Sequence, residues 1–420
     1  MIDILILADD LSGAADCASA CLRDGRSPLV LIDPLADPGD AAVVAVDVDS
    51  RARPAPEAGT AMAAQVRRLF RPETRILYQK MDSTLRGNWA RETAGVLEAL
   101  AATGGYRPLA IAAPAFPAAG RTLVDGRSLL NGTPLEATET WERESRMREG
   151  STPAAPAARL AAEGLRVAQA SLGDVRSGPD RLSALFAGAG AAGADVVVCD
   201  AQTDADLAAI AGAALALVPV PLCVGSAGLM RALAGGSERA AAPPARRHAA
   251  RAGPVLIAVG SASQVSHGQV RTLVDARGMT AIGIAPAALR GGASSPLRSV
   301  SERIDAALDA GRDLVVAIDG REGVDLRGGP ALSAALADLV APRLPRLGGL
   351  IATGGETARA ILTRSGVPGL RIRGEVEPGV PVSSAEGASG LAVITKAGAF
   401  GDSMTLVRCL DIIRGVHGNA

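Results

Sequence analysis

The chain has 420 residues, and its 43 basic and 44 acidic side chains leave a formal net charge of -1. This length exceeds what one hydrophobic core usually organises, so it predicts two domains. The balanced charge gives no electrostatic footprint for a nucleic-acid backbone, which argues against nucleic acid as a partner. Aromatic residues make up only 2% of the chain. Small and branched aliphatic side chains therefore have to fill the core, as is typical of helices packed on sheets.

The cysteines and the chain start bear on the cellular compartment. Cys17 and Cys21 lie on one helical face, where they could be redox partners or half of a metal site, but buried apolar packing is the better interpretation. The Met1-Ile2-Asp3-Ile4 start has neither basic residues nor a small-residue cleavage site, and no uncharged apolar run reaches about 18 residues. We expect a reducing cytoplasm and no membrane partner.

Helix and strand signals alternate along the first 240 residues. Aliphatic runs predict strands at 4–8, 29–32, 42–48, 76–78, 109–113, 167–170 and 196–199. Periodic stretches predict helices at 14–22, 56–70, 95–102, 159–162, 180–187 and 205–214. This alternation is that of βαβ units and predicts one doubly wound, mostly parallel sheet.

A change in composition marks the domain boundary. Residues 235–253 contain two adjacent prolines and no apolar periodicity, as is typical of an exposed linker. We predict an N-terminal domain over 1–240, a linker over 241–252 and a C-terminal domain over 253–420. In the second domain we expect strands at 255–259, 280–284, 313–318, 349–353 and 391–395, helices at 267–276, 301–310, 330–344, 357–365 and 404–415, and a loop at 320–329.

Two polar segments follow strands of the first domain, where ligands bind in doubly wound sheets. Asp9-Asp10-Leu11-Ser12-Gly13 follows the first strand. One carboxylate could accept a proton or a hydroxyl hydrogen bond, and the alternative is that Asp9 or Asp10 only caps the next helix. The mutual repulsion of two adjacent carboxylates is more than a cap needs.

The second segment is Lys80-Met81-Asp82-Ser83-Thr84-Leu85-Arg86-Gly87-Asn88. It suits a ligand with a carboxylate and several hydroxyls, because Arg86 offers a planar fork and Asp82 and Asn88 can pair with hydroxyls. A solvated loop in which Ser83 or Thr84 caps the next helix is the alternative. Arg121, after a proline-rich stretch, could meet an anion or lie exposed on a turn.

Three glycine-containing turns, at 260–263, 354–357 and 396–401, follow apolar runs of the second domain. Glycine permits close backbone approach and offers N–H groups to phosphate oxygens, while serine and threonine hydroxyls and Lys396 add donors and charge. Together they predict a nucleotide polyphosphate site, although each turn alone is typical of a tight αβ connection. No Walker loop or dinucleotide fingerprint is present. With only three histidines in the chain, we do not expect a Ser-His-Asp hydrolase.

These segments, in this order and over nearly the whole chain, resemble the signatures of the four-carbon acid sugar kinase family. The 80–88 string is the most specific of them. The resemblance implies an α/β fold of two domains, each a mostly parallel sheet flanked by helices, with the active site in the interdomain cleft. It also implies transfer of phosphate from ATP, with Mg²⁺, to the terminal hydroxyl of D-threonate, D-erythronate or 3-oxo-tetronate, giving the 4-phosphate. One departure is Ser12, where the family more often has threonine; the hydroxyl is kept.

The resemblance also assigns residues. It places the sugar acid at Asp9, Asp10, Lys80, Asp82, Ser83 and Arg86, and the nucleotide at Ser261, Ser263, Gly354, Gly355, Glu356, Thr357, Lys396, Gly398 and Gly401. Asp10, Lys80 and Asp82 are the expected catalytic residues: Lys80 meets the transferring phosphoryl group, and Asp10 or Asp82 is the general base. Arg86 is expected to meet the substrate carboxylate.

The sequence predicts no metal-ligand set, does not select one acid, and is compatible with a homo-oligomer. A non-catalytic sensor that binds a sugar acid and a nucleotide is the alternative from another class of protein. A sugar-acid dehydrogenase is disfavoured by the missing dinucleotide fingerprint.

Overall fold

The computed structural model describes residues 1–22, 26–104, 108–139, 141–142, 154–235, 251–261, 263–290, 294–319, 328–388 and 390–415. The chain divides into two compact units, Met1–Cys21 with Pro38–Ala240, and Leu22–Asp37 with Ala241–Ala420. Most of the predicted linker and of the predicted loop at 320–329 lies outside the described residues. The segment 22–37 belongs to the second unit, because its strand pairs there, whereas the sequence analysis assigned it to the first domain.

In the described part of the first unit, seven parallel strands form one sheet in the order β3-β1-β4-β11-β5-β10-β9. Their bounds are Ile4–Ala8 (β1), Val43–Asp47 (β3), Ile76–Lys80 (β4), Ala110–Ala113 (β5), Val167–Ala170 (β9), Val196–Cys199 (β10) and Leu222–Gly225 (β11). All but β9 are buried along their whole length. Burial on both faces explains why these segments are continuous aliphatic runs without polar alternation.

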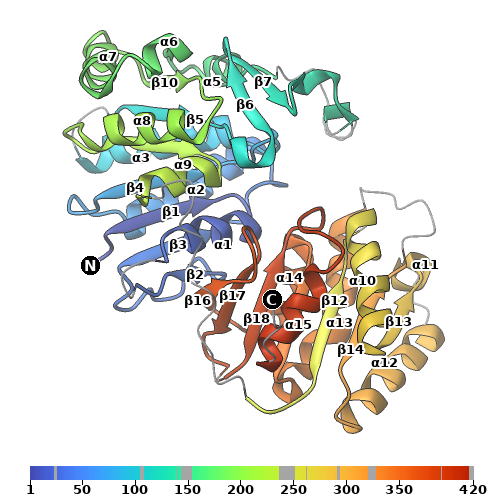
Figure 1. Ribbon diagram of the computed structural model, residues 1–420. Coiled ribbons are helices and arrows are strands. Elements are labelled where there is room, and N and C mark those ends of the chain that lie inside the picture. The colour runs from blue at the N-terminus through green and yellow to red at the C-terminus, as the bar shows by residue number, and fades with distance from the viewer. Residues whose placement is uncertain are drawn as a thin grey trace. The chain divides into compact units, whose positions relative to one another are not determined.

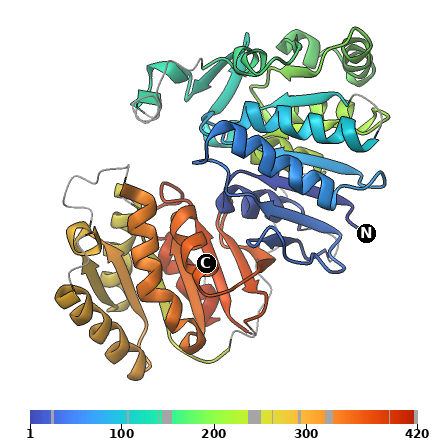
Figure 2. The same cartoon turned by 180° about the vertical axis from the view of Figure 1, so that it is seen from behind.

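The helices of this unit cover both faces of its sheet. Their bounds are Leu11–Ala20 (α1), Ala55–Leu69 (α2), Trp89–Gly104 (α3), Pro156–Ala162 (α5), Leu172–Val175 (α6), Pro179–Ala191 (α7), Asp204–Leu215 (α8) and Ala227–Leu233 (α9). Helices α1, α8 and α9 lie on the face turned to the viewer in Figure 1, and α2 and α3 lie on the face seen in Figure 2. The neighbouring strands β1 and β4 thus lead to helices on opposite faces, which makes their carboxyl ends the topological switch point of this sheet.

A small antiparallel sheet that the sequence did not predict follows β5. It consists of β6 (Arg121–Val124), β7 (Arg127–Leu130) and β8 (Thr133–Pro134), flanked by the short helices η1 (Pro117–Ala119) and η2 (Leu135–Ala137). The carboxylate of Asp200 anchors its first turn by accepting hydrogen bonds from the N–H groups of Asp125 (2.8 Å) and Gly126 (3.0 Å). Strands of two to four residues leave too little periodicity to detect.

The sheet of the second unit has the order β13-β14-β12-β15-β18-β17-β16-β2 among its described residues. The bounds are Leu29–Leu31 (β2), Val255–Val259 (β12), Thr280–Ile284 (β13), Leu314–Ile318 (β14), Gly349–Thr353 (β15), Gly369–Glu375 (β16), Pro381–Ala385 (β17) and Ala392–Lys396 (β18). The first five in this order are parallel and the remaining pairings are antiparallel. The β16–β17 pair was not predicted, because the arginines and serines of these strands interrupt the apolar pattern.

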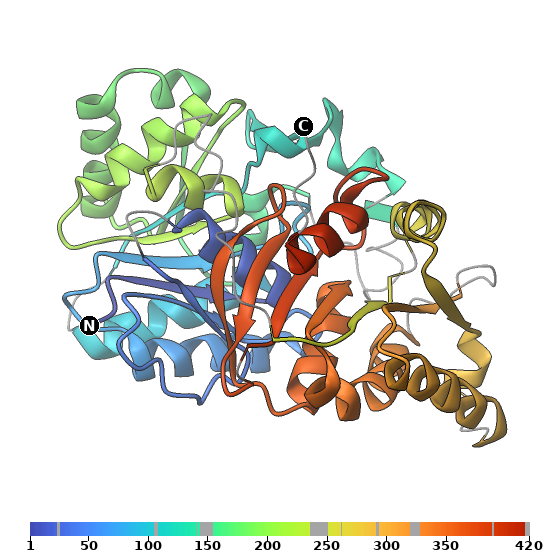
Figure 3. The ribbon, with the colours of Figure 1, turned by 60° about the horizontal axis from the view of Figure 1, so that its bottom comes forward.

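Helices also cover both faces of this sheet. They are Gln264–Arg277 (α10), Pro286–Arg290 (α11), Ser294–Asp309 (α12), Gly329–Val340 (α13), Ala341–Arg346 (η4), Gly355–Arg364 (α14) and Thr405–Arg414 (α15). Helix α10 contacts α15 on one face, while α13 contacts α14 on the other (Figure 3). The adjacent strands β12 and β15 therefore also lead to opposite faces. Among the described residues, no helix combines the length and the apolar character that crossing a membrane requires.

Candidate active site

Three loops with charged side chains meet at one edge of the first sheet. Strand β1 is paired in parallel with β3 and β4, so that Ala8 is opposite both Asp47 and Lys80. The segments that follow these strands, at 9–13, 48–53 and 80–88, consequently emerge side by side. This edge is the topological switch point between β1 and β4, where ligands bind in doubly wound sheets.

Arg51 holds the two adjacent aspartates that the sequence singled out. Its Nε and Nη2 donate to the two carboxylate oxygens of Asp9 at 2.7 and 2.8 Å, and its Nη1 donates to Asp10 Oδ2 at 2.9 Å. Asp10 also caps α1 by accepting from the N–H of Gly13 at 3.0 Å. Both interpretations of Asp10 are therefore compatible with its position. The sequence analysis missed Arg51, although its place just after a predicted strand was a signal that could have found it.

Lys80 is buried beside these carboxylates. Its Nζ donates to the carbonyl oxygen of Met81 at 2.8 Å. A Cβ atom added at Gly13 would lie 2.7 Å from Asp10 Oδ1 and 2.8 Å from Lys80 Nζ. The carboxylate and the ammonium thus both reach the start of α1. Burial lowers the pKa of Lys80, but Asp10 and Asp9 outweigh burial, so that its pKa is raised and the group stays charged.

Asp82 is fully engaged within its own loop. Its Oδ2 accepts from the hydroxyl and, at 3.0 Å, the N–H of Thr84, and Arg86 donates through Nε to Oδ2 at 3.0 Å and through Nη2 to Oδ1 at 2.5 Å. Arg86, expected to meet the substrate carboxylate, therefore has one edge of its guanidinium group on Asp82. Ser83 lies half-buried in the same loop.

The three carboxylates differ in their proton affinity. Burial raises the pKa of Asp9 in spite of Arg51. For Asp10 burial acts in the same direction, but Arg51 and Lys80 together outweigh it and the pKa is lowered. For Asp82 burial is outweighed most of all by Arg86, which holds the pKa well below its usual range. Asp10 and Asp82 are therefore ionised and able to accept a hydrogen bond.

The side chain of Asn88 shapes this edge through hydrogen bonds to the backbone. Asn88, predicted to pair with ligand hydroxyls, donates through Nδ2 to the carbonyl oxygens of Ser50 (3.2 Å) and Arg53 (2.8 Å), and so fixes the loop that carries Arg51.

Arg159 is 6% exposed, lies over the ring of Trp89 with its Cζ 5.2 Å from the centroid, and donates to the carbonyl oxygens of Leu85 and, at 3.0 Å, Gly87. Both of these residues have left-handed backbone, with φ of 61° and 83°. Arg159 thereby stabilises the turn that places Asp82. Nothing in the sequence around residue 159 indicated this role.

The three glycine turns of the second unit also meet at one edge. Strand β15 is paired in parallel with β12 and β18, with Thr353 opposite both Val259 and Lys396. The N–H of Gly354 donates to the carbonyl oxygen of Lys396 at 2.8 Å, which joins two of the turns directly. The expected nucleotide residues are thus gathered at the switch point between β12 and β15.

Close packing explains the glycines in these turns. A Cβ at Gly260 would lie 1.9 Å from Thr357 Oγ1, and a Cβ at Gly398 would lie 1.9 Å from Ser261 Oγ. Gly354 has φ of 94°, in the region that favours glycine. Ser263 caps α10 by accepting from the N–H of Val265. The amino ends of α10 and α14 therefore begin beside small side chains, an arrangement suited to phosphate oxygens.

Lys396 is the buried cation of this edge. It is 1% exposed and its Nζ donates to the carbonyl oxygens of Ala397 (3.0 Å) and Gly398 (3.3 Å). Burial lowers the pKa of Lys396 to about 8. Gly401, with φ of 83°, is packed against the hydroxyl of Thr405, and Glu356 lies in the first turn of α14. In the part of the chain that the structure describes, no group of three or more metal-ligating side chains occurs.

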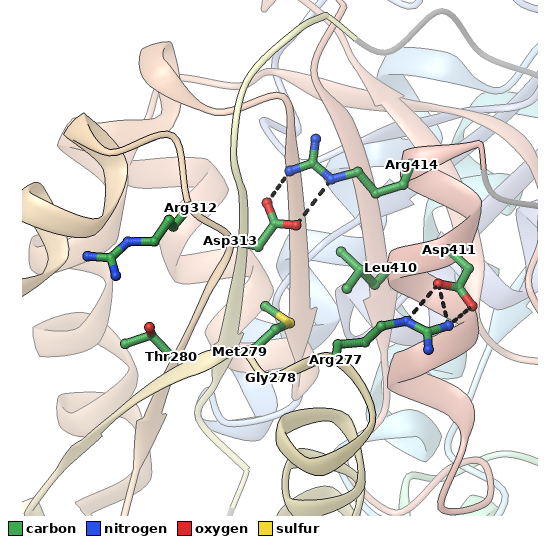
Figure 4. Close-up of a pocket in the computed structure, with 9 residues that line it drawn as sticks. All are labelled: Arg277, Gly278, Met279, Thr280, Arg312, Asp313, Leu410, Asp411 and Arg414. Atoms are coloured by element: carbon green, nitrogen blue, oxygen red, sulfur yellow. Dashed lines mark hydrogen bonds and ion pairs between the residues drawn. The ribbon is translucent and has the colours of Figure 1, made fainter.

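A hollow of about 360 Å³ lies at the opposite edge of the second sheet (Figure 4). It is found where β13 and β14 begin. Two of the arginines that line it are engaged: Arg277 pairs with Asp411 at 2.6 Å, and Arg414 pairs with Asp313. The hollow is therefore separate from the glycine turns, which follow the carboxyl ends of the strands.

Comparison with known proteins gives each of the two units a matching family model. The model of a sugar-binding N-terminal domain matches residues 4–233, and that of a nucleotide-binding C-terminal domain matches residues 256–406. The fold and its two edges thus define a two-domain protein of the kind that binds a sugar on one domain and a nucleotide on the other.

Relatives that are similar over nearly the whole chain define the class of protein more closely. The chain is 44% identical to a D-threonate kinase of Cupriavidus necator over 409 residues, which is 96% of either chain. It is 32% identical to a D-threonate kinase of Salmonella typhimurium, over 99% of either chain, and 30% identical to a 3-oxo-tetronate kinase of Cupriavidus necator, over 94% of this chain and 93% of that one. The chain belongs to the four-carbon acid sugar kinase family and is an enzyme of the kinase class. The resemblance and the α/β fold expected from the sequence are confirmed.

Proposed function

We propose that this enzyme transfers the γ-phosphoryl group of ATP to the terminal hydroxyl of a four-carbon sugar acid and forms the 4-phosphate. The observation that carries the proposal is the convergence of Asp10 and Lys80 on the start of α1, beside Gly13. In phosphoryl transfer a carboxylate can accept the proton of the attacking hydroxyl, and a cation such as an ammonium group can neutralise the charge of the transferring phosphoryl group.

In this mechanism the substrate hydroxyl oxygen forms a bond to the γ-phosphorus while the bond from that phosphorus to the bridging oxygen of ADP breaks. We assign the hydroxyl proton to Asp10, whose side chain is partly open to solvent and accepts one hydrogen bond from Arg51 and one from Gly13. Asp82 is less suited, because Thr84 and Arg86 already occupy its oxygens. Lys80 offsets the charge that develops on the transferring group.

The glycine turns of the second unit are the proposed site for the polyphosphate of ATP, with Ser261, Thr357 and Lys396 as side-chain donors. Mg²⁺ is the proposed metal, because it neutralises the β- and γ-phosphates and is commonly held by those phosphates with one or two carboxylates. Glu356 is the acidic candidate among the expected nucleotide residues. Chelation with EDTA is expected to abolish transfer, and titration with MgCl₂ to restore it.

D-threonate is the proposed acid, because the relatives that are 44% and 32% identical carry that name, while 3-oxo-tetronate kinase is the name of one at 30%. The test is a coupled ADP assay with ATP and D-threonate, D-erythronate and 3-oxo-tetronate. ADP release with none of the three acids would favour the sensor alternative. Phosphorus NMR of the product would identify the phosphorylated hydroxyl.

The assignment of the base has its own test. We expect Asp10→Asn to lower kcat by at least ~10²-fold, as is usual for loss of a general base, with little change in the melting temperature. Asp82→Asn is expected to loosen its loop and to raise the KM for the acid. A large loss of kcat in Asp82→Asn, with near-normal kcat in Asp10→Asn, would transfer the role to Asp82.

A further inference from the structure

At the edge of the first sheet where β1, β3 and β4 end, which we call the sugar-acid edge, three carboxylates face three cations before any substrate binds. The three carboxylates are those of Asp9, Asp10 and Asp82, and the three cations are Arg51, Lys80 and Arg86. Each carboxylate faces a cation within this set. A sugar acid brings one more negative charge, so its carboxylate needs either a further cation or the displacement of an existing ion pair.

Arg121 is a further cation near this edge. It follows the carboxyl end of β5, which belongs to the same parallel sheet as β4. The pKa of Arg121 is lowered, mostly by burial. The carboxylate of Asp82 raises this pKa and the guanidinium of Arg86 lowers it, so Arg121 lies within electrostatic reach of both side chains.

One edge of the Arg121 guanidinium group has no acceptor among the described residues. Its Nη1 donates to the carbonyl oxygen of Ala119, whereas its buried Nε makes no hydrogen bond with any described residue. Nε and the adjacent Nη2 form the edge that pairs with both oxygens of a carboxylate, as Arg51 does with Asp9. A buried donor without an acceptor is costly, and a substrate carboxylate would remove that cost.

The backbone that carries Arg121 is rigid. The N–H and carbonyl groups of Phe116 and Arg121 exchange two hydrogen bonds, of 2.7 and 3.0 Å, around η1. Gly120 closes this turn with φ of 72°, and a Cβ there would lie 1.9 Å from Asn131 Oδ1. A guanidinium held on such a turn loses little freedom when it binds a ligand.

We propose that Arg121 binds the carboxylate of the sugar acid and thereby makes the enzyme select an acid over the corresponding uncharged polyol. This inference rests on the proposed kinase function. In this proposal Arg86 positions Asp82 and does not bind the substrate carboxylate, which is the role expected from the sequence. Lysine should replace Arg121 only in part, because an ammonium cannot offer two parallel donors.

The test compares D-threonate with D-threitol, which keeps the other three hydroxyls but has a hydroxymethyl group in place of the carboxylate. We expect Arg121→Met to lower kcat/KM for D-threonate by about 10- to 100-fold, mostly through KM, as loss of a charged hydrogen bond predicts. The KM for ATP and the weaker activity with threitol should stay unchanged. The kcat/KM of Arg121→Lys for D-threonate should lie between those of wild type and Arg121→Met. Arg127→Met is the matched control, because Arg127 lies in the same small sheet and pairs with Glu136 at 3.7 Å on the surface.

Calorimetric titration of D-threonate and threitol into wild type and Arg121→Met measures the same selectivity without catalysis. Preference for D-threonate that survives in Arg121→Met would overturn the proposal. Equal losses for the acid and the polyol would also overturn it, since they would indicate a structural role. If wild type binds D-threonate through Arg121 but turns over no acid, the proposed kinase function fails while this inference stands.

Discussion

Gly13→Ala is a small substitution that should separate catalysis from stability. Gly13 lies in the first turn of α1, where an alanine Cβ would come within 2.7 Å of Asp10 Oδ1 and 2.8 Å of Lys80 Nζ. Ordinary van der Waals contact begins near 3.4 Å. Asp10 Oδ1 and Lys80 Nζ would therefore each have to move by roughly 0.6 Å or more to avoid overlap with the new methyl group. These are the atoms to which we assign the hydroxyl proton and the phosphoryl charge.

The expected magnitudes differ for the two properties. Alanine is favoured over glycine in a helix by up to about 1 kcal/mol, while pushing two side chains from their rotamers costs about 1–3 kcal/mol. The free energy of unfolding should therefore fall by no more than about 3 kcal/mol. Turnover should fall by up to ~10²-fold, because a misplacement of reacting groups by about 1 Å has an effect of that order.

The assay is steady-state ADP release with D-threonate, beside urea unfolding of the same samples. Gly212→Ala is the matched control, since Gly212 lies in α8 and, outside its own helix backbone and chain neighbours, no described atom lies within 4 Å of its Cβ position. That variant should gain up to about 1 kcal/mol of stability and keep full activity. Full turnover in Gly13→Ala would refute the assigned roles of Asp10 and Lys80.

Three further outcomes are expected. Arg159→Met should raise the KM for the acid by about tenfold or more, because two carbonyl groups lose a charged donor, without changing the KM for ATP; Arg159→Lys should restore part of the loss. Gly260→Ala should weaken binding of a non-hydrolysable ATP analogue, because its Cβ would clash with Thr357, whereas Gly283→Ala, with open space around its Cβ, should not. As the pH rises through about 8, Lys396 loses its proton and binding of that analogue should weaken, and Lys396→Met should abolish this dependence. A pH-independent affinity in wild type would exclude Lys396 as a ligand of the phosphates.

The same pKa has a consequence for stability with the opposite sign. Between pH of about 8 and the usual value of 10.5, Lys396 is neutral in the folded protein and charged in the unfolded chain. The unfolded state then binds more protons, so the free energy of unfolding should increase as the pH rises through this window. Lys396→Met removes this contribution, which can be measured by urea unfolding at pH 7.5 to 9.5 against wild type.

The parallel strands and the strand ends that carry the candidate site were predictable from the sequence. Segments such as Ile4–Ala8 and Val255–Val259 are buried on both faces, and such burial leaves an unbroken aliphatic run that ends where the polar loop begins. The short sheet from Arg121 to Pro134 and the β16–β17 pair could not be predicted in this way, because their residues alternate or are few. Segment 22–37 shows a further limit, since only pairing of β2 with β16 reveals which unit it joins.

The side chains that the sequence analysis did not assign are all arginines whose partners lie far along the chain. Arg51 reaches back 42 residues to Asp9, and Arg159 reaches back 72 residues to Gly87. A local pattern can show that a segment is rich in donors, as 80–88 is, but it cannot show which donors are already used. That distinction decides the chemistry here: Arg86 is conspicuous in the sequence and occupied in the structure, while Arg121 is ordinary in the sequence and keeps one edge without an acceptor among the described residues. Binding of the substrate carboxylate should therefore follow the arginine that the fold leaves unsatisfied.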